Sequence, residues 1–65
     1  MKIVSNVTGI EIQVGHLIQS IQDDLYRVLG FIESTPSFEA MVKVQGRFDK
    51  EVTYLFISMF NLREE

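Results

Sequence analysis

The chain has no cysteine and no tryptophan, and it has only one histidine and one proline in 65 residues. Without cysteine it can form neither a disulfide nor a thiolate zinc site, and thiol redox chemistry is excluded. The lone His16 cannot build a histidine-rich metal site within one chain, so we expect no metal and no other cofactor. A single domain of residues 1–65 is near the size at which one core is only marginally stable. Self-association or a partner remains as the way to stabilise it.

Long apolar runs and clustered charges are also missing. No run approaches the roughly 20 apolar residues of a membrane helix, so we expect no membrane association. The N-terminus lacks the apolar block of a secretory signal, which makes a cytoplasmic location the default expectation. The formal net charge is −3, and the six basic residues are spread along the chain. Tight nucleic-acid binding depends on clustered cations, so this distribution argues against it.

The segment DDLYRVLGFIES, residues 23–34, fits two periodicities. Its apolar residues alternate as in a strand, and over residues 16–34 they also recur three and four apart as in an amphipathic helix. The chain has a single alanine and is rich in Ile, Val, Phe and Tyr, which suit a pleated surface. Gly30 inside a helix would also cost about 1 kcal/mol. We therefore predict a strand, and an α+β fold with a helix at about residues 16–34 remains the alternative.

The rest of the chain fits an all-β fold of short antiparallel strands. Alternating apolar residues predict strands, polar residues predict the turns between them, and a late helical turn precedes a last short strand. The predicted strands cover residues 10–14, 17–21, 25–33, 38–45 and 52–57, with a hairpin loop at 46–50, a helical turn at 58–60 and a last strand at 61–63. This pattern predicts a small closed barrel, since closure removes exposed strand edges.

Residues 24–31, DLYRVLGF, resemble the strand that enters the curved sheet of SH3-like barrels of the KOW and Tudor type. They are locally most similar to the N-terminal barrel of elongation factor P, as are Gly15 and the Ala-x-Val-x-Val pattern of residues 40–44. The resemblance spans residues 15–45 and implies a five-stranded SH3-like antiparallel barrel. Residues 34–39 lack the lysine that elongation factor P carries on the corresponding loop, so its function is not implied. A Tudor-type cage needs several converging aromatic rings, and most of those present here are needed for a core.

No pattern of catalytic residues stands out. His16 is the only histidine and follows Gly15 at a predicted turn, without the motif of a seryl nucleophile. Asp23 and Asp24 lack the further ligands of a magnesium or calcium site, and turn formation explains them better. The other carboxylates form no recognisable pair. We therefore predict that the protein is not an enzyme, with a site assembled at an oligomer axis as the alternative.

Apolar residues occupy both faces of two predicted strands, 25–33 and 52–57. If Tyr26, Val28 and Ile32 face the interior, the other apolar residues of the first strand point outwards around Arg27. One barrel cannot bury both faces of two strands, and an outward apolar patch marks an interface. The alternative is that residues 1–4 or 59–62 cover the second face within one chain. The predicted protein interface consists of Arg27, Leu29, Phe31, Leu55 and Ile57.

The hairpin loop at residues 46–50 is the second candidate site. Arg47 and Lys50 flank Phe48, which could stack on a base while the cations contact phosphates. The alternative, which the sequence favours, is that Phe48 folds back over the end of the barrel. We predict a non-catalytic protein–protein interaction module that acts as a homo-oligomer, in the role of an accessory subunit, a small regulator or a phage-encoded inhibitor. The alternative function is a weak RNA- or ribosome-associated KOW-like module that uses the hairpin loop.

Overall fold

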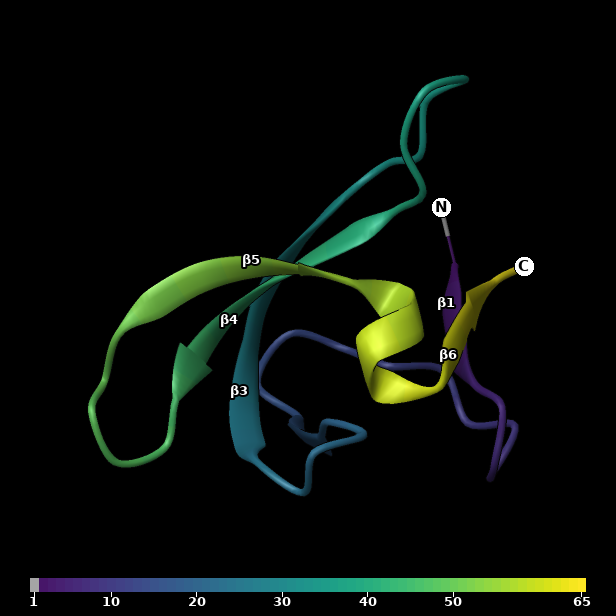
Figure 1. The fold of residues 1–65 in the computed structure, drawn as a ribbon. Helices are drawn as coiled ribbons and strands as arrows, with labels where there is room; N and C mark the ends of the chain where they lie inside the picture. The colour runs from purple at the N-terminus through teal and green to yellow at the C-terminus, as the bar shows by residue number, and fades with distance from the viewer. Residues whose placement is uncertain (1) are drawn as a thin grey trace.

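A computed structural model describes residues 2–65 as six short strands and one 3-10 turn (Figure 1). A two-stranded sheet pairs the first and last strands, and a four-stranded antiparallel meander runs β2-β3-β4-β5. The described residues contain no α-helix, so the predicted all-β fold is confirmed and the helix at residues 16–34 is wrong. Neither sheet closes on itself, so the closed five-stranded barrel does not form. The elements are β1 (Ile3–Ser5), β2 (Leu17–Gln19), β3 (Leu25–Ile32), β4 (Met41–Gly46), β5 (Val52–Phe56), η1 (Ile57–Phe60) and β6 (Leu62–Glu64).

The segment at residues 10–14 differs from its prediction. It forms a single bridge, between Val4 and Glu11, instead of a strand, and most of its side chains are exposed. Gly9 and Gly15, both with positive φ angles of 75° and 96°, bend the backbone on either side of it. The segment therefore passes beside β1 as a loop, where its backbone hydrogen bonds cover the free edge of that strand.

A bulge in β3 decides which of its side chains face the core. Val28 pairs with Val44 and Gly30 pairs with Lys43, so Leu29 is an extra residue without a partner on β4. Beyond the bulge the alternation is shifted by one position, and Phe31 packs against the core while Ile32 is exposed. The expectations that Ile32 faces the interior and that Phe31 faces outwards are therefore wrong.

The core lies between the inner face of the meander and the terminal strands. Valines from β3 and β4 at its centre have no accessible surface. The ring of Tyr26 meets that of Phe60 edge to face, with centroids 5.6 Å apart. The terminal segments thus complete the inner core and leave the outer face of the meander uncovered, while Met1 lies outside the described residues. The core residues are Ile3, Ile18, Val28, Ala40, Val42, Val44, Ile57, Phe60 and Leu62.

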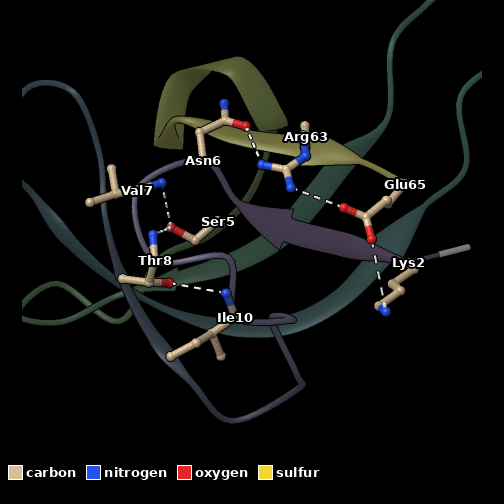
Figure 2. Close-up of polar contacts among 8 residues, drawn as sticks. All are labelled: Lys2, Ser5, Asn6, Val7, Thr8, Ile10, Arg63 and Glu65. Carbon is tan, nitrogen blue, oxygen red and sulfur yellow. Dashed lines mark hydrogen bonds and ion pairs between the residues drawn. The ribbon is translucent and has the colours of Figure 1, made fainter.

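The two ends of the chain lie side by side (Figure 1) and are joined by polar contacts (Figure 2). The Nη1 of Arg63 donates to the Oδ1 of Asn6 at 3.1 Å, and its Nη2 forms an ion pair with Glu65 at 3.0 Å. Glu65 also lies 3.9 Å from the Nζ of Lys2, and its backbone N–H donates to the Lys2 carbonyl. Ion pairs this exposed contribute at most about 1 kcal/mol, so strand pairing and burial hold the ends together.

Candidate functional site

The outer face of the four-stranded sheet is the surface opposite the core. The strand register aligns its side chains in three rows that run across the sheet. The rows are Leu17-Arg27-Gln45-Val52, Gly30-Lys43-Tyr54 and Ile32-Met41-Phe56. These rows contain two cations and no acidic side chain, so the face combines apolar surface with a positive charge.

Exposed apolar side chains are concentrated on β5 at one edge of this face. Val52 and Tyr54 are each 47% exposed and Phe56 is 37% exposed. Alternation along the strand places all three on the outer face, while Leu55 between them packs against the core. Leu17 and Ile32 add exposed apolar surface on β2 and β3. An apolar group of this kind, on the side that the core does not use, is a candidate for an interface.

The predicted interface residues of β3 have different positions. Arg27 is exposed on the outer face, and its Nη1 donates to the Gly15 carbonyl at 3.3 Å. Leu29 is half-buried at the bulge. Phe31 packs against the core because the bulge turns it inwards.

The predicted interface residues of β5 and η1 belong to the inner side. Leu55 packs against the core opposite the buried Val42, and Ile57 is only 7% exposed. The expectation that these two residues face outwards is therefore wrong. The register of the hairpin is the signal that identifies the correct face. Lys43 alternates with buried valines on β4, and Leu55 pairs with Val42, so Leu55 lies on the same side as the valines.

The hairpin tip between β4 and β5 holds Phe48 in solvent. Its side chain is 88% exposed, and the guanidinium carbon of Arg47 lies 5.4 Å from the ring centroid. The expectation that Phe48 folds back over the end of the sheet is therefore wrong. A hollow of about 320 Å³ beside the tip is lined by Asp23, Asp24 and Asp49, among other residues. Carboxylates so close to the tip oppose the attraction of Arg47 and Lys50 for phosphate.

A second hollow, a groove of about 750 Å³, separates the loop after β1 from β2 and η1. Several of its polar side chains hold turns through hydrogen bonds to the backbone. The Ser5 hydroxyl accepts from the N–H groups of Val7 and Thr8, and the Thr8 hydroxyl accepts from the N–H of Ile10 (Figure 2). The Nδ1 of His16 accepts from the N–H of Gln13 at 3.1 Å. These contacts organise the backbone and pair no nucleophile with a base.

Within residues 2–65, no group of three or more histidine, cysteine or acidic side chains is placed to hold a metal ion. The same residues contain no helix long and apolar enough to cross a membrane. No protein-family model, no curated protein and no solved structure matches the chain. The outer face and the hairpin tip are therefore the two candidate sites in the described residues.

Proposed function

We propose that this protein is a non-catalytic protein–protein interaction module that acts as a homo-oligomer through its outer sheet face. The exposed row of Val52, Tyr54 and Phe56 is the observation that carries the proposal. Fully burying one large apolar side chain is worth about 1.5–3 kcal/mol, so even partial burial of three is substantial for a domain of this size. The only charged side chains in the rows, Arg27 and Lys43, lie on β3 and β4, so an interface centred on β5 would desolvate little charge.

We also infer an SH3-like arrangement, supported by the order of the elements. A meander is followed by a 3-10 turn and by a last strand that pairs with the first. The small size and the spread charges suit an accessory or regulatory protein in the cytoplasm, such as a small subunit or a phage-encoded inhibitor of another protein. Fold alone does not assign a function, so the interface is the part to test.

Light scattering across a dilution series tests the proposal, with circular dichroism on the same samples. We expect a dimer or larger species for the natural sequence and a shift toward monomer for Phe56→Ser. Phe38→Ser is the matched control, because Phe38 is an exposed phenylalanine in the loop between β3 and β4. A monomer at all concentrations for the natural sequence would contradict self-association.

A second candidate function is weak binding of RNA or the ribosome at the hairpin tip, favoured by the exposed Phe48 beside Arg47. Such a ring can stack on a base while Arg47 and Lys50 contact phosphates. Fluorescence anisotropy with a single-stranded RNA oligonucleotide measures it. Arg47→Glu should abolish binding, whereas Lys43→Glu on the outer face should leave it unchanged. Equal binding by Arg47→Glu and the natural sequence would exclude the tip as the site.

A further inference from the structure

Strand β5 is an edge strand of the four-stranded sheet (Figure 1). Among the described elements, β5 packs mainly against β4 and against η1, which follows β5 in the chain. The backbone bonds from Gly46 N–H to the Glu51 carbonyl and from Ile57 N–H to the Ala40 carbonyl mark hydrogen-bonded pairs of the β4–β5 register. Hydrogen-bonded and non-hydrogen-bonded pairs alternate in an antiparallel ladder. The N–H and C=O groups of Val52, Tyr54 and Phe56 therefore point to the free edge.

This edge lacks the features that natural proteins use to prevent edge-to-edge pairing. The strand reads Val-Thr-Tyr-Leu-Phe, with no charged residue and no proline, and its pairing with β4 has no bulge. Charges, prolines and bulges are the usual protections on exposed edges. The residues with free backbone groups are the same ones that expose apolar side chains on the outer face. One strand therefore offers both backbone hydrogen bonds and apolar surface.

We propose that β5 pairs antiparallel with β5 of a second copy of this chain, about a two-fold axis at Tyr54. This inference rests on the proposed self-association and names its interface. In this register Tyr54 lies opposite Tyr54 of the second copy, and Val52 lies opposite Phe56 of the second copy. Each of these pairs joins residues whose backbone groups point to the edge, so each can exchange both hydrogen bonds. The two meanders then form one continuous eight-stranded sheet, with the apolar rows adjacent.

Charges at the two ends of β5 favour the antiparallel arrangement. Lys50 precedes the strand, and at the far end Glu39 accepts a hydrogen bond from Ser58 at 2.6 Å. Antiparallel pairing about Tyr54 brings Lys50 toward Ser58 and Glu39 of the second copy, once on each side of the axis. Parallel pairing would bring like charges together instead. Glu51 follows the alternation of Leu55 and projects from the opposite side of the sheet, away from this contact.

A proline at the axis tests the backbone pairing. The N–H of Tyr54 points away from β4, so Tyr54→Pro removes no hydrogen bond inside one chain. It removes the two bonds that the Tyr54 N–H groups would make at the axis, which predicts a loss of association of roughly 10- to 100-fold beyond that of Tyr54→Ala. Sedimentation or light scattering measures the loss, with circular dichroism to show that both variants remain folded. Equal association by the two variants would contradict edge pairing.

Cross-linking tests the register directly, because the chain has no cysteine of its own. Tyr54→Cys should give a disulfide-linked dimer on oxidation, since Cα atoms of a hydrogen-bonded pair lie about 5.5 Å apart, within disulfide range. Leu17→Cys is the control, because Leu17 is exposed on β2 at the other edge of the sheet. If the natural sequence dimerises but Tyr54→Cys cross-links no faster than Leu17→Cys, edge pairing would be overturned. Self-association itself would still stand. A monomeric natural sequence would overturn both.

A charge exchange gives a third and independent result. Lys50→Glu and Glu39→Lys should each weaken association, because each places like charges together at both ends of the paired strands. The double variant, Lys50→Glu with Glu39→Lys, restores opposite charges and should recover association to near that of the natural sequence. Additive weakening in the double variant would contradict the predicted contact between Lys50 and Glu39 of the second copy.

Discussion

Ser20 shows at the scale of one residue how a buried polar group can fix a turn. It is 6% exposed, and its hydroxyl accepts hydrogen bonds from the N–H groups of Gln22 and Asp24, both at 3.2 Å. The backbone N–H of Ile21 in the same turn donates to the Met59 carbonyl of η1. The turn between β2 and β3 is thus connected to the far end of the chain.

We expect Ser20→Ala to reduce the free energy of unfolding by about 1–3 kcal/mol, because two partly buried N–H groups lose their acceptor. Urea denaturation followed by circular dichroism measures the change. Ser37→Ala is the control, because Ser37 is exposed in the loop between β3 and β4. If the two variants lose the same stability, the hydroxyl of Ser20 does not hold the turn.

At the scale of an element, the bulge in β3 contains one residue that can be deleted without changing which side chains of the strand face the core. Leu29 has no partner on β4, so deleting it leaves a regular strand in which Val28 and Phe31 still face the core. We expect this deletion to keep cooperative unfolding with a loss of about 1–3 kcal/mol. Deleting Lys43, a paired residue, would turn Val42 and Val44 to opposite faces, and we expect that chain not to fold. Cooperative denaturation of the chain without Lys43 would contradict the assignment of Leu29 as the extra residue of the bulge. A chain without Leu29 that shows no cooperative denaturation would contradict it as well.

Strand positions could be predicted from the sequence wherever polar residues mark one face. Lys43 between two buried valines identifies both the strand and its inner face, and the hairpin that follows fixes the pairing of β5. In β3 apolar residues occupy both faces, so alternation finds the strand and leaves its inner face undecided. The available signal was Gly30, since a glycine inside a strand often marks a bulge. Regular alternation without the bulge predicts the wrong face for Phe31.

An exposed apolar face could be predicted from the sequence, but the residues that lie on it could not. The excess of apolar residues on two strands predicts either an outward apolar patch or a second face covered by the terminal segments, and the exposed Val52, Tyr54 and Phe56 agree with the first alternative. Which side chains lie there depends on pairing between distant segments. The strand β1 also depends on such pairing, since its three residues are placed by contacts with β6 at the other end of the chain. Local periodicity contains no information on those contacts.

At the scale of the whole molecule, a small core and an unprotected edge would both favour pairing with a second copy. The core is small, and the largest fully buried side chains among the described residues are valines, so its contribution to stability is limited. Pairing of β5 with a second copy would add stability that one chain lacks. A dimer that unfolds to two separate chains becomes more stable as its concentration rises, whereas a monomer does not.

We therefore expect the midpoint of thermal unfolding to rise with protein concentration. A tenfold increase is worth about 1.4 kcal/mol per dimer, or about 0.7 kcal/mol per chain, which for a domain of this size corresponds to a rise of roughly 3–6 °C. Circular dichroism melts over a hundredfold range of concentration measure it. Tyr54→Pro should show a midpoint independent of concentration, because it blocks the edge without removing a bond within the chain. A midpoint independent of concentration in the natural sequence would contradict the two-fold pairing of β5, because the pairing would then contribute nothing to stability.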